Sequence, residues 1–289
     1  MILVTGGSGQ LATALAALSP LVRVVGRPEF DFDEPSSIDA LFATARPDAL
    51  INAAAWTAVD LAESHRDAAW RANCDGPGRL ARLCAERDIP FVHVSTDYVF
   101  DGTKGAPYVE TDPPAPSGVY GASKLAGEQA VLHACPDAVI LRTSWVYAAT
   151  GRNFLRTMLD AGRRHATLRV VSDQIGCPTA APALARAILD VLARMADAPG
   201  GIVHAAGQGW TSWHGFAEAI FAAAARHGVA SPEVVAIRTE DWPTPTRRPA
   251  DSRLECSLLA ARFGVRLPPW RQSLDAVIDQ LFAAGELAG

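Results

Sequence analysis

Short runs of apolar residues recur through the first half of the chain, and each is followed by a longer stretch with helical spacing of apolar positions. Runs without strict alternation are typical of strands in a parallel sheet that is covered on both faces. The predicted strands are residues 2–5, 22–25, 49–52, 91–94 and 138–141, and the first two helices begin near Gln10 and Ser36. This alternation predicts an α/β fold with a doubly wound parallel sheet of the Rossmann type, whose ligand lies beyond the carboxyl ends of the strands.

The pattern changes at two places. Gly76-Pro77-Gly78 interrupts a stretch that is otherwise helical over residues 64–86, so we expect a kink or break with Pro77 beginning the second part. After Tyr147 the segments become more polar and proline-rich, with helices predicted over 183–195, 212–226 and 272–284 and strands over 168–171 and 202–205. We therefore expect a dinucleotide-binding core over residues 1–147, to which later segments return, and a smaller, mainly substrate-binding lobe over 148–289.

Composition excludes several classes of protein. With 49% hydrophobic and 20% charged residues and no run of ~18 apolar residues, the chain is typical of a soluble protein without a membrane partner. Residues 1–5 do not have the features of a secretory signal, and five scattered cysteines form no CxxC pair, so we expect a cytoplasmic protein with reduced thiols. The cysteines and histidines form no cluster at the spacing of zinc ligands, so the sequence gives no support for a zinc site. A net charge of −5 argues against a nucleic-acid partner.

A glycine-rich turn directly follows the first predicted strand and opens the first helix. It reads Gly6-Gly7-Ser8-Gly9-Gln10-Leu11-Ala12. Gly6 and Gly9 allow a tight turn that brings the N–H groups of a helix N-terminus against a pyrophosphate. A tight turn without a ligand is the alternative, but the position after the first strand favours a dinucleotide.

The end of the second predicted strand bears on the choice of coenzyme. An acidic residue there would bond the ribose 2′-hydroxyl of NAD, whereas an arginine accommodates the 2′-phosphate of NADP. Gly26 and Arg27 follow Val25, and no carboxylate stands at that position. The sequence therefore predicts NADPH as the cofactor, with NADH as the second choice and a solvated surface charge as the alternative explanation of Arg27.

A phenol and an ammonium group stand one helical turn apart at Tyr120 and Lys124. A fixed cation beside a phenol favours the phenolate, which predicts a proton-transfer site. Taken alone, the spacing would more often mean two ordinary surface residues. Ser95 and Thr96, at the end of the fourth strand, place a hydroxyl where it can reach a carbonyl oxygen above the sheet, and Thr96 is the candidate.

These features together resemble the extended short-chain dehydrogenase/reductase superfamily, and further motifs are similar to those of the dTDP-4-dehydrorhamnose reductases. The matching segments occur in family order over essentially the whole chain: Gly6-x-x-Gly9-Gln10-Leu11, Asn52-Ala-Ala-Ala55, Thr57-Ala-Val-Asp60 with Glu63, Ser95 to Phe100, Tyr120 to Lys124, Arg142 to Tyr147, Asp173-Gln174 with Pro178-Thr179, Trp213-His214 and Ser252-Arg253-Leu254.

The resemblance implies an enzyme that reduces the 4-keto group of a dTDP-linked 4-keto-6-deoxy sugar, dTDP-4-dehydro-L-rhamnose, to dTDP-L-rhamnose. In that reaction the nicotinamide gives hydride to the carbonyl carbon and Tyr120 gives a proton to the developing alkoxide. Thr96 donates a hydrogen bond to the same oxygen. Lys124 tunes the phenol and holds the nicotinamide ribose.

The resemblance also implies two sets of binding residues. Those for the cofactor are Gly6, Gly9, Gln10, Leu11, Arg27, Asp31, Phe32, Asn52, Ala53, Ala54, Tyr120 and Lys124. Those for the substrate are Thr57, Val59, Thr96, Trp145, Asn153 and, for the diphosphate, Arg247 or Arg253. For Trp145 a place in the core is an equal alternative.

Two departures from the family pattern limit what is carried over. Arg248-Pro249-Ala250-Asp251 stands where the family commonly has Arg-Pro-Gly-Asn, which adds a carboxylate near the presumed diphosphate site. Residues 10–19 contain no Asp or Glu of the kind that holds a metal between subunits in some members. We therefore expect no metal, and a homodimer stays open. The alternatives in function are a reductase or epimerase for a related sugar nucleotide, and a noncatalytic NADP-binding regulatory subunit.

Overall fold

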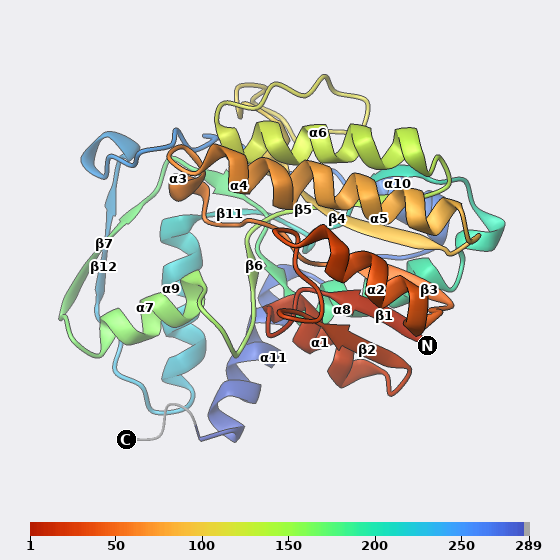
Figure 1. Cartoon of the computed structure of the whole chain (residues 1–289). Coiled ribbons are helices and arrows are strands. Elements are labelled where there is room, and N and C mark those ends of the chain that lie inside the picture. The colour runs from red at the N-terminus through yellow and green to blue at the C-terminus, as the bar shows by residue number, and fades with distance from the viewer. Residues whose placement is uncertain (286–289) are drawn as a thin grey trace.

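A six-stranded parallel sheet forms the centre of the computed structural model, which describes residues 1–285 (Figure 1). The strand order is β10-β5-β4-β3-β1-β2. The strands are β1 (Ile2–Thr5), β2 (Val22–Val25), β3 (Ala49–Asn52), β4 (Phe91–Thr96), β5 (Val139–Thr143) and β10 (Gly201–His204). The predicted doubly wound α/β fold is confirmed, and β4 and β5 extend two residues further than predicted, to Thr96 and Thr143.

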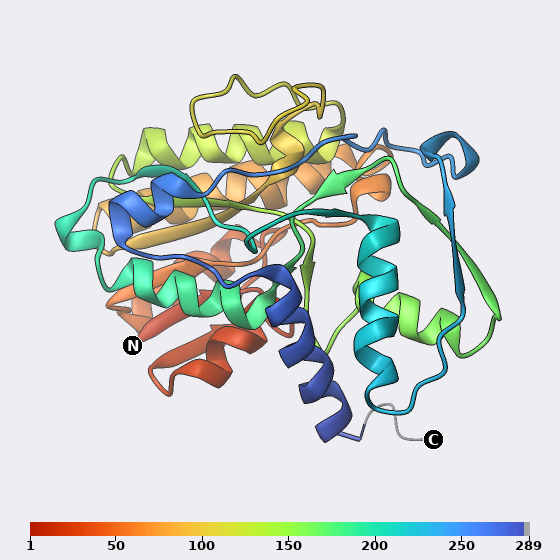
Figure 2. The ribbon, with the colours of Figure 1, turned by 180° about the vertical axis from the view of Figure 1, so that it is seen from behind.

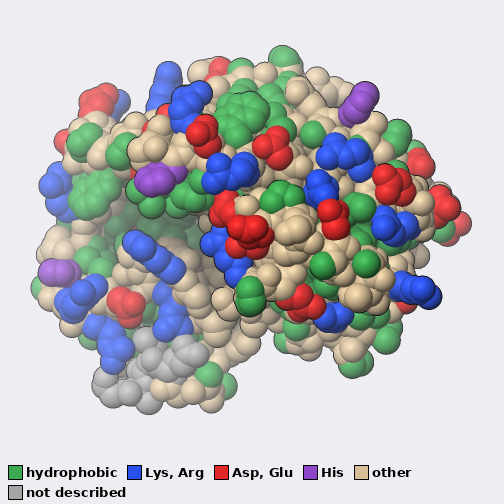
Figure 3. Space-filling model, in the orientation of Figure 1, with side chains coloured by type: hydrophobic (Ala, Val, Ile, Leu, Met, Phe, Trp, Pro, Cys, Tyr) green, Lys and Arg blue, Asp and Glu red, His purple; other side chains and the backbone are tan. Residues whose placement is uncertain are grey.

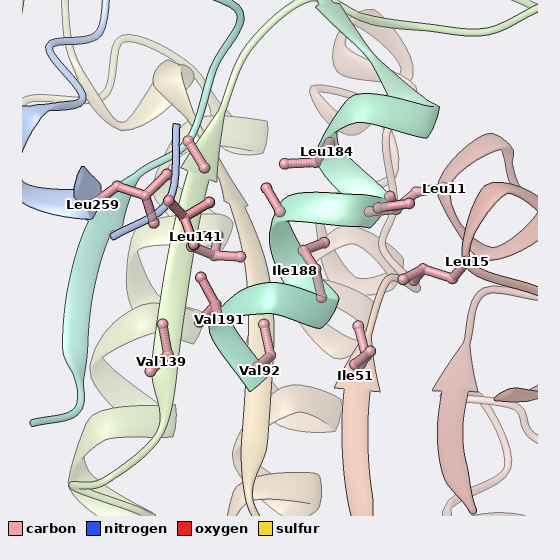
Figure 4. Packing of buried hydrophobic residues seen from close by; sticks show 14 of the residues in the cluster. Leu11, Leu15, Ile51, Val92, Val139, Leu141, Leu184, Ile188, Val191 and Leu259 are labelled. Atoms are coloured by element: carbon pink, nitrogen blue, oxygen red, sulfur yellow. The ribbon is translucent and has the colours of Figure 1, made fainter. Parts of the chain in front are cut away.

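Helices cover both faces of this sheet because successive residues of each strand point to opposite sides. Leu3 of β1 packs with helices α2 (Pro35–Ala45), α5 (Gly76–Ala85) and α6 (Val119–Ala134), whereas Val4 packs with α1 (Gln10–Leu18) and α8 (Ala181–Leu192). Figure 4 shows Leu184, Ile188 and Val191 of α8 lying over the strands. Figure 2 shows α8 across the face that is hidden in Figure 1.

The stretch that precedes α5 runs into it without the break expected at Gly76-Pro77-Gly78, because the backbone stays helical from Arg66 to Ala85 and its irregularity lies just before Gly76. It consists of α3 (Val59–Ala62), α4 (Arg66–Trp70) and a π-helical turn at Arg71–Asp75, after which α5 begins with Pro77 in its first turn. A β-carbon on Gly76 would lie 2.0 Å from the ring of Phe32, so only glycine lets the loop after β2 pack against this point. The contact between Gly76 and Phe32 therefore joins the end of the π turn to the loop after β2.

A second lobe stands beside the carboxyl ends of the strands (Figure 1). Its core is shared by α7, α9 and α11 with the parallel pair β7 and β12. The bounds are α7 (Phe154–Gly162), α9 (Trp213–Ala225), α11 (Trp270–Ala283), β7 (Thr167–Val171) and β12 (Glu233–Ile237); the remaining elements are β6 (Val146–Tyr147), β8 (Ile175–Gly176), β9 (Thr179–Ala180), β11 (Thr211–Ser212), α10 (Ser257–Phe263) and the 3₁₀ turns Asp97–Val99, Met195–Asp197 and Thr239–Asp241.

Segments of the second half also return to the central sheet. Strand β10 pairs with β5, and α8 and Leu259 of α10 lie in the core beside α1. Within residues 1–285, no helix is both long and apolar enough to cross a bilayer.

Candidate active site

A cavity of about 680 Å³ lies where the carboxyl ends of β1, β3, β4 and β5 face the second lobe. Residues of both parts line it, including Gly9, Thr96 and Tyr120 from the first half and Trp145 and Trp213 from the lobe side. A second hollow of about 480 Å³ adjoins it at Gly6 and extends beyond the end of β2. The surface is hollowed between the two parts of the molecule (Figure 3). This is where a doubly wound sheet binds its ligand.

The glycine turn fits a dinucleotide. Gly6 and Gly7 have φ values of 118° and 53°, which favour glycine, and a β-carbon on Gly6 would lie 3.2 Å from the carbonyl of Ala53. Gly9 precedes α1 and provides no side-chain cap, so the first N–H groups of this helix are left for a ligand. Side chains in place of these glycines would fill the cradle that the turn forms beside Ala53.

Other predicted cofactor residues surround this turn. Ala53, Ala54, Gln10 and Leu11 line the larger cavity. Asn52 lies buried beneath it: its Oδ1 accepts hydrogen bonds from Thr5 Oγ1 at 2.5 Å and from the backbone N–H of Ala54 at 3.3 Å. Asn52 therefore orders the loop that lines the cavity.

The smaller hollow is lined by Arg27, Asp31, Phe32 and Asp33. Arg27 makes ion pairs with Asp31 at 2.7 Å and with Asp33 at 2.6 Å. No carboxylate follows β2 directly, but the loop turns back and places the carboxylates of Asp31 and Asp33 against Arg27. Their positions four and six residues after Arg27 gave no signal of this contact.

Thr96, Tyr120 and Lys124 all line the larger cavity. Thr96 ends β4, and α6 begins at Val119, whose N–H donates to Glu63 Oε1 at 2.8 Å. The Tyr120 phenol lies near enough to Thr96 for the threonine hydroxyl to affect its pKa. Lys124, on the next turn of α6, donates from Nζ to the carbonyl of Val94 at 2.6 Å. The structure thus brings the three predicted residues together.

Burial controls the titration of Tyr120 and Lys124. It raises the pKa of the Tyr120 phenol well above its ordinary value, and the neighbouring Thr96 hydroxyl partly offsets this rise. Burial also lowers the pKa of Lys124 to about 8, against the opposing effect of Glu128. The expectation that the ammonium favours the phenolate is therefore wrong here, because removal from water dominates. The phenol is kept protonated, as a proton donor requires.

Asp97 is a residue that the sequence analysis missed. It follows Thr96, is fully buried, and accepts a hydrogen bond from Thr96 Oγ1 to its Oδ1 at 3.0 Å. Burial raises its pKa to about 6. Asp97 also lines the cavity, where it accepts the Thr96 hydroxyl proton in the structure without a bound substrate.

Two stacked tryptophans form part of the wall on the lobe side. The rings of Trp145 and Trp213 lie 3.4 Å apart, nearly parallel at 6°, and both line the cavity. Trp145 has φ 48°, an uncommon value for a bulky residue, and its ring occupies space left by Gly176. Trp213 was not predicted as a site residue. Thr57 and Val59, which follow β3 in the chain, line the same cavity.

Three predicted substrate residues are placed elsewhere. Asn153 caps α7 and donates from Nδ2 to Gln10 Oε1 at 2.8 Å, which ties the lobe to α1. Arg253 pairs with Asp251 at 2.5 Å and donates to the carbonyl of Gly105, and Arg247 is exposed. Neither arginine lines the cavity, because these contacts hold Arg253 beside the 101–108 loop. Arg152 lines the cavity instead.

Metal ligands do not gather in the part of the chain that the structure describes. Among residues 1–285, no group of three or more His, Cys, Asp or Glu side chains is placed to hold an ion. The absence of a metal requirement stays a prediction.

Comparison with known proteins identifies close relatives. Residues 1–283 match the family model described as the RmlD substrate binding domain. The chain is 44% identical to a dTDP-4-dehydrorhamnose reductase of Burkholderia thailandensis over 98% of this chain and 99% of that protein, and 42% identical to one of Sinorhizobium fredii over 98% of both.

Solved structures give the same picture. A dTDP-4-dehydrorhamnose reductase from Clostridium acetobutylicum superposes with a TM-score of 0.90 at 35% identity, over 97% of this chain and 99% of that one. One from Bacillus anthracis, in complex with NADP, also gives a TM-score of 0.90, at 32% identity over 96% and 98%.

Proposed function

This chain belongs to the dTDP-4-dehydrorhamnose reductase family, and from that premise we propose that it reduces the 4-keto group of dTDP-4-dehydro-L-rhamnose to give dTDP-L-rhamnose, with NADPH as the reductant. The observation that carries the proposal is the meeting of Thr96, Tyr120 and Lys124 in one cavity beside a glycine cradle. A noncatalytic nucleotide-binding subunit has no need for all three side chains.

We assign the proton transfer to Tyr120 and Thr96. A bound nicotinamide coenzyme supplies the hydride that the carbonyl carbon receives. Tyr120, protonated because it is buried, donates its phenolic proton to the carbonyl oxygen as negative charge develops there. Thr96 has a single hydroxyl proton, which it turns from Asp97 to the same oxygen.

Lys124 is assigned to hold the coenzyme. A protonated lysine has three donors, and the carbonyl of Val94 takes one, so two remain for ribose hydroxyls. The buried contact with Val94 fixes Nζ relative to Tyr120 on the same face of α6. Lys124 thereby aligns the coenzyme with the substrate carbonyl and reduces the entropy lost in reaching the reactive geometry.

We assign the sugar nucleotide to the lobe side of the cavity. Trp145 and Trp213 provide aromatic surface for a base or sugar ring, and Thr57 and Val59 line the same cavity. Arg152 replaces Arg247 and Arg253 as the candidate ligand of the diphosphate, since it lines both this cavity and the neighbouring hollow beside α7.

The proposed function predicts that the purified protein oxidises NADPH when given freshly generated 4-keto sugar nucleotide. We expect a higher kcat/KM with NADPH than with NADH, because Arg27 faces the hollow beyond β2. The decrease in absorbance of the reduced coenzyme measures both. Turnover that clearly favours NADH would contradict the coenzyme assignment but not the reaction.

The lowered pKa of Lys124 predicts a pH dependence of coenzyme binding. Lys124 is an ammonium ion below about pH 8 and loses its charge as the pH rises through that value, so the Kd for NADPH should rise several-fold. Tyr120 stays protonated over this range because its pKa is raised. Titration of NADPH fluorescence at a series of pH values measures the change. The Lys124→Met variant should bind NADPH more weakly than the wild type, and its Kd should not rise as the pH passes about 8. A Kd that rises with pH in this variant as it does in the wild type would refute the assignment.

A further inference from the structure

Two arginines from distant parts of the chain converge on one carboxylate beyond β2. Asp33 Oδ2 accepts from Arg27 Nη2 at 2.6 Å, and Asp33 Oδ1 accepts from Nε of Arg71 at 3.0 Å. Arg27, Asp31 and Asp33 line the 480 Å³ hollow that adjoins the glycine turn, and Asp31 also pairs with Arg27 at 2.7 Å. Arg71 reaches this group through its ion pair with Asp33. The carboxylate of Asp33 therefore lies between two guanidinium groups.

Stability does not account for this arrangement. The side chains of Arg27, Asp33 and Arg71 are 68%, 44% and 46% exposed, and exposed ion pairs contribute little to folding. Two like charges brought this close repel each other unless an anion stands between them. The arrangement is consequently poised to take another anion in place of Asp33.

The position of Arg71 depends on an uncommon feature of the backbone. Arg71 is the first residue of the π-helical turn Arg71–Asp75, and turns of this kind are frequent at functional sites. Ala68 of α4 and Ala72 of this turn both line the hollow, so the helical segment that carries Arg71 forms part of its wall. The turn thus directs Arg71 to Asp33 from a segment that is far from Arg27 in the sequence.

We propose that Arg27 and Arg71 form a two-arginine clamp for the 2′-phosphate of NADPH, and that Asp33 occupies the phosphate position when this group is absent. The inference rests on the proposed use of NADPH and adds a specificity residue, Arg71, and an internal competitor, Asp33. A phosphate monoester carries more charge than a carboxylate and three acceptor oxygens, so it displaces Asp33 toward solvent. A ligand without this phosphate leaves the Asp33 ion pairs intact.

Calorimetry with two nucleotide fragments tests the clamp without catalysis. Adenosine 2′,5′-bisphosphate carries the phosphate in question, and adenosine 5′-monophosphate lacks it. Wild-type protein should bind the bisphosphate more tightly. Arg71→Gln should weaken bisphosphate binding about tenfold, as for the loss of one charged hydrogen-bonding partner, and leave the monophosphate unchanged. Asp33→Asn should strengthen binding of the bisphosphate and leave binding of the monophosphate unchanged, because the carboxylate that competes with the 2′-phosphate is removed.

Arg79→Gln is the matched control. Arg79 of α5 also makes an ion pair with an aspartate about 40 residues earlier, Asp39, but neither residue lines the hollow. This variant should bind both fragments like the wild type. The difference between the fragments should also shrink at high salt, since the clamp is partly exposed.

The outcomes separate the clamp from the proposed function. If the wild type favours the bisphosphate and Arg71→Gln does not reduce that preference, the clamp is refuted while NADPH remains the coenzyme. If the wild type binds both fragments equally, the clamp and the NADPH preference both fail, and reduction with NADH still tests the reaction. Equal weakening of both fragments in Arg71→Gln means a structural role and also refutes the clamp.

Discussion

Tyr120→Phe lowers kcat by about 10²–10⁴-fold while NADPH binds as tightly as it does to the wild type. The substitution removes only the hydroxyl of a side chain that lines the cavity together with Thr96. Without this proton donor, the alkoxide forming on the sugar must take its proton from water. The ring remains, and with it the edge-to-face contact with Tyr98, so the fold of the site is retained. Steady-state kinetics together with fluorescence titration of NADPH measure the two effects separately.

Tyr147→Phe is the control for loss of a buried phenol. The hydroxyl of Tyr147 lies in the core of the second lobe, at 3.4 Å from the carbonyl of Trp270, and does not line the cavity. It should retain near-normal kcat. Tyr120→Phe with more than about a tenth of wild-type kcat would remove Tyr120 from the role of proton donor.

The largest expected effect on stability comes from Arg142→Met, which should lower the free energy of unfolding by about 3–5 kcal/mol. Arg142 of β5 and Glu128 of α6 form a two-pronged ion pair, at 2.9 and 2.6 Å, with side chains only 2% and 1% exposed. Ser95 also donates to Glu128 at 2.5 Å. Removal of the guanidinium leaves a buried carboxylate without its main counter-ion. Urea unfolding followed by circular dichroism measures the change.

Two comparisons identify the cause. Arg226→Met removes an ion pair with Asp275 in which both side chains are about half exposed, and should cost less than about 1 kcal/mol. The double variant Arg142→Met, Glu128→Leu should be more stable than Arg142→Met alone, because no unpaired charge stays buried. A loss in Arg142→Met no greater than in Arg226→Met would show that this buried pair does not stabilise the fold as its burial implies.

The sheet and its helices could be predicted because each depends on local pattern. Apolar runs mark β1 to β5, and the residues expected for proton transfer lie at a strand end and on the first turns of a helix, where neighbours in sequence are neighbours in space. Pro77 marked the start of α5 for the same reason, since proline is tolerated only in the first turn of a helix.

The parts of the site that could not be predicted depend on contacts between distant segments. Trp213 reaches the cavity by stacking on Trp145, which a positive φ turns toward it. Arg71 meets Asp33 only because a π turn and the packing of Phe32 against Gly76 bring two loops together. Neither contact has a spacing that one sequence reveals.

The electrostatic effect of Lys124 was also beyond sequence reasoning. Its position one turn after Tyr120 suggests attraction between an ammonium ion and a phenolate, whereas burial dominates both groups and shifts both toward their neutral forms. Burial of a side chain depends on every element packed around it, so its contribution becomes clear only in three dimensions.

The most direct test of the central claim follows a deuterium label. NADPH labelled with deuterium on either face of the nicotinamide C4 is incubated with the protein and the 4-keto sugar nucleotide, and the product is analysed by NMR. Label from one of the two faces should appear at C4 of a 6-deoxy sugar that is still attached to its nucleotide, and Tyr120→Phe should form little of this product. If wild-type protein binds NADPH but transfers no deuterium to the sugar, or places it at another carbon, the proposed 4-keto reduction is contradicted.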